Sequence, residues 1–364
     1  MYARSTREAG PLGRGRDRAP VLFSSADEPL YPPVVRRRAW LFGGLFVVAL
    51  VLVAWWALFV GSVSLSPGEV WAALRGEGRT AAQNIVWDLR LPRILAGALV
   101  GSALAASGAI LQGVLRNPLA DPSLIGVSAG AGLVAAALYL LFPENLAFLP
   151  LGAFLGALGT TLFIYAIAWL RGAAPVTLIL VGLAINAVLG AAMTALMVVF
   201  GDRVAPVVLW HAGRLTGVSW PEVHMAVPYA AVGILLTFFA VRPLKMLLLG
   251  DEVAASLGFP VRTARFFLIA LASFLAGTAV SVAGLLGFVG LVVPHIVRLL
   301  VGGDYRHVLP LSLLFGGLFV VLADTGARTV LAPFELPVGV FLSSVGGLFF
   351  LYLLFRGRVG GVNV

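Results

Sequence analysis

Long apolar segments alternate with short polar ones along almost the whole chain. About ten of them approach the ~20 helical residues that are needed to cross the hydrocarbon core of a bilayer. They are 39–62, 92–115, 123–142, 147–170, 176–200, 223–241, 264–284, 287–301, 308–330 and 338–355. Because helices satisfy their own backbone hydrogen bonds in lipid, the pattern predicts an all-α polytopic membrane protein with about ten transmembrane helices.

The most polar interruption between these segments is 242–265, which reads RPLKMLLLGDEVAASLGFPVRTAR. Gly250 interrupts an apolar turn, Asp251 is a residue type that caps helix N-termini, and Gly258 ends the turn that follows. We therefore expect two short surface helices within 243–263. From the pattern alone, this pair is either an inert connector or a place where a partner outside the membrane pushes on the protein.

Weaker signals describe the other connections. The segments 66–74 and 81–89 have the amphipathic pattern of short helices that lie on the membrane surface. In NPLADP (117–122) two prolines and an asparagine separate two spans, and Asp121 is expected to cap the helix that follows. Small residues are frequent within the spans, as in GALVGSALAASG at 97–108, and they predict closely packed helices.

The basic residues separate the two sides of the predicted bundle. One side gathers arginines that few acidic residues accompany, while the arginines of the other side are mixed with acidic residues. The positive-inside rule then places both termini in the cytosol. We predict a disordered cytosolic arm at 1–37, a transmembrane domain at 38–358 and a cytosolic tail at 359–364.

The composition supports the membrane assignment. Sixty per cent of the residues are hydrophobic, only 11% are charged, and the mean hydropathy is +1.01, whereas soluble domains carry roughly 25% charged residues. The net charge of +9 does not predict nucleic-acid binding, because the basic residues lie at the ends of apolar segments. The chain has no cysteine, which excludes disulfides, thiol catalysis and cysteine metal sites.

Residues that could do chemistry are few. The interiors of the first eight predicted spans carry no Asp, Glu, Arg or Lys, so the ionisable relay of a typical ion-coupled transporter is missing there. Asp324 and Arg328, four residues apart in the ninth span, are expected to form a structural pair. The four histidines are too scattered to predict a metal site. There is no phosphate-binding G-x-x-x-x-G-K-[ST] motif, and Lys245 is the only lysine.

We therefore expect no enzymatic activity and no bound cofactor. A chain of this kind is either a passive pore, a carrier that uses an unrecognised ion site, or one part of a machine that is powered by another subunit.

Several sequence blocks, taken together, resemble the FecCD family of permeases from type II ABC importers. The blocks cover about residues 60–356 in the order that the family shows. They are RLPR (90–93), LQGVLRNPLADPSLIGVSAGAG (111–132), LGDEVAASLG (249–258), GFVGLVVPHIVRLLVGGDYR (287–306), ADTGAR (323–328) and ELPVG (335–339).

This resemblance implies an architecture and a set of partners. Family members have ten helices and form homodimers with the pathway along the two-fold axis, in the cytoplasmic (inner) membrane of bacteria. Two ATP-binding subunits, which bind ATP and Mg, attach at the cytosolic face. A periplasmic or lipid-anchored binding protein delivers the substrate.

The resemblance also assigns roles to residues of this chain. Its coupling helices, which contact the ATPase subunits, would include Asp251, Glu252, Ala255, Leu257 and Gly258. The cytosolic gate would include Ala174, Pro175, Val176 and Thr177, where other members often have small hydroxyl residues. Arg90, Arg93 and Arg328 would dock the binding protein.

Alternatives to these roles follow from the residues themselves. The three arginines would instead reach lipid headgroups, or Arg328 would serve only Asp324. Asn186 either faces the pathway or bonds a neighbouring helix. The resemblance favours haem or a ferric siderophore as the substrate, and cobalamin is the alternative. An ion-coupled carrier or channel is the competing class of protein.

Overall fold

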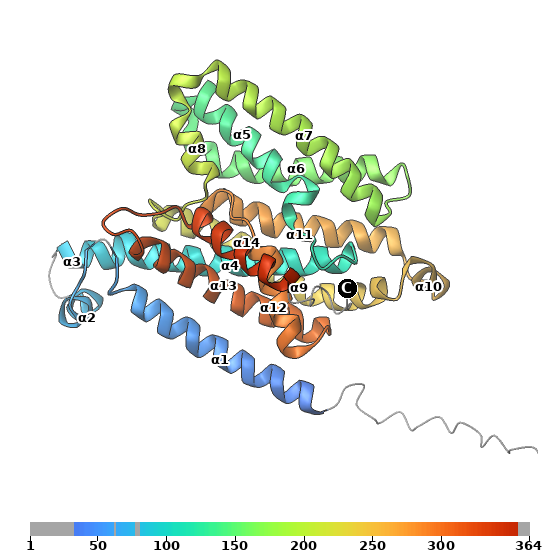
Figure 1. Cartoon of the computed structure of the whole chain (residues 1–364), viewed down its shortest axis with the longest axis horizontal. Coiled ribbons are helices and arrows are strands. Elements are labelled where there is room, and N and C mark those ends of the chain that lie inside the picture. Colours follow the sequence, from blue (N-terminus) through green and yellow to red (C-terminus); the bar gives the residue numbers. More distant parts are fainter. Residues whose placement is uncertain (1–32, 62, 77–80, 356–364) are drawn as a thin grey trace, which may run out of the picture.

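The chain folds into a bundle of helices (Figure 1). The computed structural model describes residues 33–61, 63–76 and 81–355, and these residues contain helices and turns but no strand. Seven helices are long and apolar enough to cross a membrane. They are α1 (Pro33–Ala57), α4 (Leu91–Val114), α6 (Leu149–Trp169), α7 (Pro175–Val199), α9 (Trp220–Leu248), α11 (Val261–Ala283) and α13 (Tyr305–Thr329).

Three shorter apolar helices complete the predicted set of spans. They are α5 (Val127–Leu141), α12 (Val289–Val301) and α14 (Val338–Phe355). The seven long and three short helices follow the order of the ten apolar segments, so the all-α polytopic fold is confirmed.

Short elements connect the spans. They are α2 (Pro67–Arg75), α3 (Ala81–Asn84), a π-helical turn at Ile85–Arg90, the 3₁₀ turns Pro122–Ile125, Pro143–Phe148 and Gly201–Arg203, α8 (Ala205–His211) and α10 (Asp251–Ser256). A capping box begins α2, in which Ser66 and Glu69 satisfy each other's backbone amides. The Asp121 carboxylate accepts a hydrogen bond from the Ser123 amide and so caps the 3₁₀ turn Pro122–Ile125, whereas the N-cap of α5, the predicted third span, is Gly126. The helix α8 was not predicted.

The most buried long helix is α4, which packs against α9, α11, α12 and α13. Glycines allow two very close approaches. A Cβ atom on Gly101 would lie 2.1 Å from the Gly316 carbonyl oxygen of α13, and one on Gly108 would lie 1.9 Å from the Gly290 carbonyl oxygen of α12. The small residues of 97–108 therefore bring backbones together, as their composition predicted.

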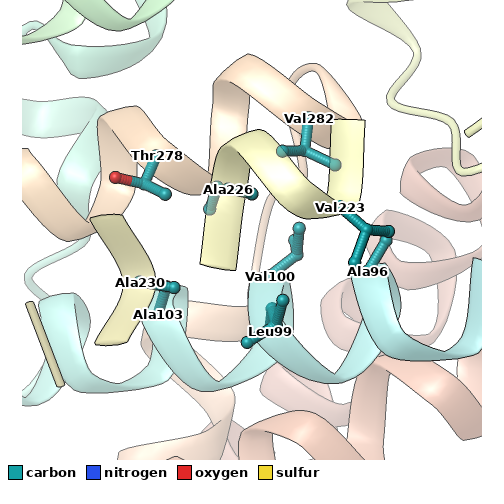
Figure 2. A pocket seen from close by; sticks show the side chains of 10 residues that line it. Ala96, Leu99, Val100, Ala103, Val223, Ala226, Ala230, Thr278 and Val282 are labelled. Carbon is teal, nitrogen blue, oxygen red and sulfur yellow. The ribbon is translucent and has the colours of Figure 1, made fainter. Parts of the chain in front are cut away.

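Side chains fill the space around α4. Figure 2 shows a cavity that lies between α4, α9 and α11, and its volume is only about 10 Å³. Its lining is almost entirely alanine, valine and leucine, with Thr278 as the polar member. A cavity of this size holds about one water molecule. The space that α4, α9 and α11 enclose is therefore almost completely filled.

Helices at the periphery expose apolar side chains. Only 11% of the most apolar stretch is buried in α1 and in α7, compared with 78% in the stretch that contains α4. Exposed residues of α7 include Leu180, Leu183 and Val198, and those of α14 include Leu348 and Leu351. These faces are available to lipid or to another protein chain.

The two ends of the bundle are named here by their short helices. The α10 face contains α10 and the loops 115–121 and 170–174, and the α2 face contains α2 and the loops 212–219 and 330–337 (Figure 1).

Two boundaries differ from the prediction. Residues 33–37, which were assigned to the disordered arm, belong to α1, while the rest of the arm and the tail at 359–364 lie outside the described residues. The sixth span does not end near residue 241, because α9 continues to Leu248 with Pro243 inside it.

Candidate functional sites at the two faces of the bundle

One short helix, α10, lies where two were predicted. The apolar turn that we expected to form a separate helix is the last part of α9. Gly250 then adopts a positive φ of 96° and begins α10. The prediction of paired short helices within 243–263 is therefore wrong, because α9 extends through Pro243.

The Asp251 side chain forms ion pairs instead of capping α10. Gly250 occupies the N-cap position, and Asp251 is the first helical residue. The Asp251 carboxylate accepts hydrogen bonds from Arg265 Nη2 at 2.8 and 3.0 Å and from Arg116 Nη2 at 3.1 Å. These arginines come from α11 and from the loop after α4, so one carboxylate joins three parts of the α10 face.

The remaining residues that were predicted to couple lie on the surface of α10. Glu252, Ala255, Leu257 and Gly258 are exposed, while Ala254 is buried against the bundle. Leu257 is 64% exposed. A short helix that is anchored on one side and presents a leucine on the other is suited to contact another protein.

The predicted gate residues follow a tight turn between α6 and α7. Ala173 is fully buried and has a φ of 54°, a conformation that is uncommon for a residue with a side chain. Ala174 is exposed, Pro175 is the first residue of α7, Val176 is 67% exposed, and Thr177 is half-buried. The turn therefore offers a mainly apolar surface.

Asn186 makes the helix contact that was one of its two predicted roles. Its Nδ2 atom donates a hydrogen bond to the Ser123 carbonyl oxygen at 2.9 Å. Asn186 lies in α7 and Ser123 in the 3₁₀ turn before α5, so the bond joins two neighbouring elements.

A second ion pair of the α10 face links α9 to α13. The Lys245 ammonium lies 2.7 Å from Asp304 Oδ1, and the same carboxylate caps α13 through the Arg306 amide. Burial raises the pKa of Asp304, but the hydrogen bond from Lys245 and the amide bond outweigh it, so the pKa lies below its usual value.

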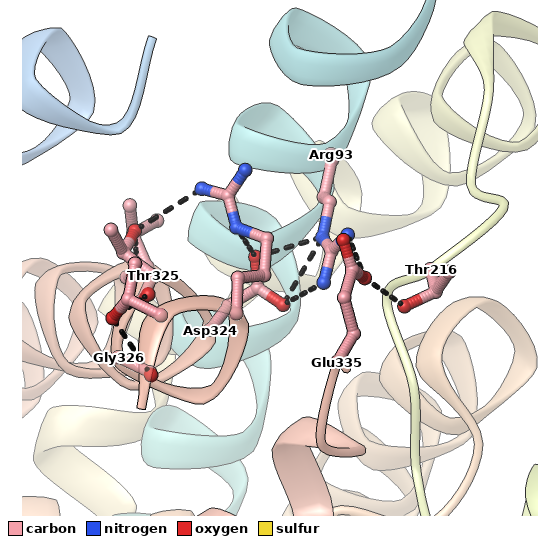
Figure 3. Close-up of polar contacts among 9 residues, drawn as sticks. Arg93, Thr216, Asp324, Thr325, Gly326 and Glu335 are labelled. Atoms are coloured by element: carbon pink, nitrogen blue, oxygen red, sulfur yellow. Dashed lines mark hydrogen bonds and ion pairs between the residues drawn. The ribbon is translucent and has the colours of Figure 1, made fainter. Parts of the chain in front are cut away.

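At the α2 face two of the three predicted docking arginines, Arg93 and Arg328, meet carboxylates, and Figure 3 shows Arg93 between Asp324 and Glu335. Arg93 Nε and Nη2 each lie 2.9 Å from an oxygen of Asp324, and Arg93 Nη1 lies 2.9 Å from Glu335 Oε2. Glu335 also accepts a hydrogen bond from Thr216 at 3.0 Å. The predicted pair of Asp324 and Arg328 is present, with Nε 3.4 Å from Oδ2.

Arg90 is held in a different way. It is 5% exposed and donates hydrogen bonds to the carbonyl oxygens of Leu58 and Val63. A Cβ atom on Gly61 would lie 3.3 Å from an Arg90 nitrogen and 3.7 Å from an Arg328 nitrogen, so both guanidinium groups lie next to Gly61. Among the residues that the structure describes, the α2-face cluster therefore holds Arg90, Arg93 and Arg328 with only two carboxylates, Asp324 and Glu335.

The interpretation of these arginines as lipid-facing side chains is wrong. Arg90, Arg93 and Arg328 are at most 9% exposed, and their hydrogen bonds go to protein groups. Arg93 and Arg328 do not reach headgroups because α4, which carries Arg93, packs against α13, which carries Arg328.

Sequence reasoning missed several residues of the two faces. Glu335 and Thr216 at the α2 face lie in loops, and Arg116 and Arg265 at the α10 face looked like ordinary topology-determining arginines. Glu335 had one usable signal, because it belongs to the ELPVG block that carried the resemblance.

Comparison with known families gives a match over most of the chain. The model of the FecCD transport family matches residues 48–356.

Three relatives illustrate the range of named substrates. A probable siderophore transport system permease of Bacillus subtilis is 37% identical, with 88% of this chain and 96% of the relative covered. A cobalamin import permease of Halobacterium salinarum is 46% identical, with 75% and 74% covered. A hemin transport permease of Yersinia pestis is 39% identical, with 86% and 95% covered.

A solved structure shares the fold. It is a metal-chelate type ABC transporter in an inward-facing conformation, with a TM-score of 0.76 and 26% sequence identity. The alignment covers 90% of this chain and 100% of the other.

Proposed function

This chain belongs to the FecCD transport family, and from that premise we propose that two copies of it form the translocation pathway of an ATP-driven importer. It is a permease component of an ABC importer for an iron chelate, haem or cobalamin. Three points are proposals: that the chain forms a homodimer, that a binding protein delivers the substrate, and which substrate is carried.

The lack of free space between α4, α9 and α11 is the observation that carries the proposal. The helices around α4 leave a cavity of about 10 Å³ (Figure 2), which is far too small for a chelate. A pathway for a large solute therefore runs along the outside of the chain, and a second copy would provide its other wall. The exposed apolar faces of α7 and α14 are the available surfaces for this.

Energy would come from separate ATP-binding subunits at the α10 face. The chain has no phosphate-binding lysine motif, and α10 presents Leu257 and neighbouring small residues outward. ATP and Mg would be bound by those partners. The turn at 173–177 would form the gate on the same face.

The substrate-binding protein would dock at the α2 face. The three arginines and two carboxylates of the α2-face cluster leave one positive charge in excess (3 − 2 = +1), and both hydrogen bonds of Arg90 go to uncharged carbonyl groups. An acidic residue of the partner would supply the missing negative charge. The three arginines are at most 9% exposed and already bond groups of this chain, so the excess charge would attract an acidic partner surface through its electrostatic field and not through direct hydrogen bonds.

The docking role has a direct test. Arg90→Gln should weaken binding of the purified partner protein, and the loss should shrink as salt is raised, because screening reduces the contribution of the charge. Arg203→Gln is the control, since Arg203 is an exposed arginine of the 3₁₀ turn after α7 and lies outside the cluster. Equal affinity of Arg90→Gln and wild type at low salt would contradict the role.

The proposed orientation places the α10 face and both termini in the cytosol of a bacterium, with the chain in the inner membrane. The absence of native cysteine allows single labels. Ser256→Cys in α10 should resist an impermeant thiol reagent added outside, and Gly217→Cys at the α2 face should react. The reverse pattern would overturn the orientation.

An iron chelate, meaning haem or a ferric siderophore, is the substrate class that we propose. Two observations support this class. The LQGVLRNPLADP block resembles haem and siderophore permeases, and the relatives include a siderophore permease and a hemin permease. Cobalamin is the second candidate, because the halobacterial relative is 46% identical.

Transport by the assembled complex decides between these substrates. The chain should be reconstituted with its ATPase and binding-protein partners, and uptake of each ligand measured with and without ATP. We expect ATP-dependent uptake of one iron chelate and none by the chain alone. Uptake driven by an ion gradient without ATP would place the chain in the carrier class instead.

A further inference from the structure

A single buried side chain connects α10 to the turn before α7. Arg265 lies in α11 and is 1% exposed. Its Nη2 atom binds both carboxylate oxygens of Asp251, the first residue of α10, at 2.8 and 3.0 Å. Its Nη1 atom donates to the Ala173 carbonyl oxygen at 2.9 Å.

The two ends of this connection belong to separate proposed sites. Asp251 fixes the helix that would contact an ATPase subunit, and Ala173 is the buried residue immediately before the exposed gate residue Ala174. In sequence, Arg265 lies 14 residues from Asp251 and 92 from Ala173. The guanidinium group is therefore a direct physical link between distant segments.

The chemistry of the link makes it rigid. A guanidinium is planar and holds its donors in fixed directions, so a shift of Asp251 changes the direction in which Nη1 points. The guanidinium group and its bond to Ala173 are buried, so water does not readily replace this partner, whereas the Asp251 side chain is 35% exposed. Ala173 already has a positive φ, which allows its turn few alternative conformations.

We propose that Arg265 is a positioning residue that transmits the displacement of α10 to the gate turn at 173–177. The inference rests on the proposed function, since it assumes that an ATPase moves α10 and that the turn at 173–177 gates the pathway. Arg116 also binds Asp251 but lies 37% exposed, and its described bond reaches only Asp251. Arg265 alone of the two reaches the gate turn.

A single cysteine in the gate turn tests the link. Ala174→Cys is exposed and is the only thiol in this cysteine-free chain. In the complex with a cysteine-free ATPase partner, its rate of reaction with a maleimide is measured without nucleotide and with ATP plus vanadate. We expect the two rates to differ in the otherwise wild-type chain. Arg265→Gln should abolish the difference while ATP hydrolysis by the assembled complex continues.

Three further variants separate transmission from folding. Asp251→Asn cuts the other end of the link and should reduce the nucleotide-dependent difference even if Arg265→Gln fails to assemble. Arg265→Lys keeps the charge without the fork, so it should not restore the difference. Arg242→Gln is the control, because Arg242 is an exposed arginine of α9 outside the link, and it should retain the response.

The outcomes are distinguishable. A nucleotide response that persists in both Arg265→Gln and Asp251→Asn overturns the inference alone. If both variants lose assembly, ATP hydrolysis and the labelling difference together, Arg265 has a structural role, and this result also overturns the inference. An otherwise wild-type complex that shows neither a nucleotide response nor ATP-driven uptake overturns the proposed function, and the inference with it.

Discussion

Asp324→Asn removes the charge that two buried arginines share. The Asp324 carboxylate is 4% exposed, accepts hydrogen bonds from Arg93 at 2.9 Å to each oxygen, and lies 3.4 Å from Arg328 Nε. The substitution preserves the shape of the side chain but leaves Arg328 without a carboxylate in contact (Figure 3). We expect a clear loss of stability.

The size of the loss follows from burial. Breaking a buried ion pair by removing one partner costs about 3–5 kcal/mol. Asparagine keeps one acceptor oxygen, and Arg93 keeps Glu335, so we expect about 2–4 kcal/mol for Asp324→Asn. Glu335→Gln is the matched control, because its side chain is 25% exposed and it also binds Arg93. Its cost should be about 1 kcal/mol or less, as for partly exposed pairs.

Equilibrium unfolding in mixed detergent micelles, followed by tryptophan fluorescence, measures both values. The free energies of unfolding of the two variants and wild type are compared at the same pH and salt. If Glu335→Gln costs as much as Asp324→Asn, the assignment of Asp324 as the central counter-charge is wrong. An unchanged stability of Asp324→Asn would contradict the burial argument itself.

Three further predictions follow from other features. Leu257→Asp should fold like wild type, because this side chain is 64% exposed, but it should fail to co-purify with the ATPase; undiminished transport would contradict the proposed role of α10. Gly108→Ala should lower the free energy of unfolding by about 1–3 kcal/mol through overpacking. Gly44→Ala should leave the free energy of unfolding unchanged by overpacking, because a Cβ atom on Gly44 would have no neighbouring atom within 4 Å. Because the pKa of Asp304 is lowered, the contribution of its pair with Lys245 is complete above the unfolded-state pKa and is lost as pH falls through the folded-state pKa. Stability measured from neutral to acidic pH should therefore decline less in Asp304→Asn than in wild type, and parallel curves would refute this.

The sequence predicted the spans well because the bilayer sets their length and apolar character. Hydropathy over about 20 residues identified the ten segments, and local chemistry identified Asp121 as a cap, which begins the 3₁₀ turn before α5. The end of α9 was missed for a physical reason. Proline interrupts helices in water, but in a membrane bundle neighbouring groups compensate for the missing hydrogen bond, and α9 continues through Pro243.

The side-chain roles could not be predicted, because they depend on distant partners. Local rules assigned Asp251 to the N-cap position, yet two arginines 14 and 135 residues away hold its carboxylate. Arg93 and Asp324 are separated by 231 residues. Both residues belong to sequence blocks that resemble the family, RLPR and ADTGAR. Only the packing of α4 against α13 shows that they bind each other.

The length of α9 has a mechanical consequence. Its 29 residues form a helix of about 44 Å at 1.5 Å per residue, which exceeds the ~30 Å hydrocarbon core. At one end the Trp220 indole donates a hydrogen bond to the Trp87 carbonyl oxygen near α3, and at the other end the chain turns directly into α10. In the proposed orientation, the two ends of this helix therefore lie on opposite sides of the membrane. A tilt of α9 would therefore displace both ends of the helix at once. The end that leads into α10 would move in one direction, and the end at Trp220 would move in the opposite direction.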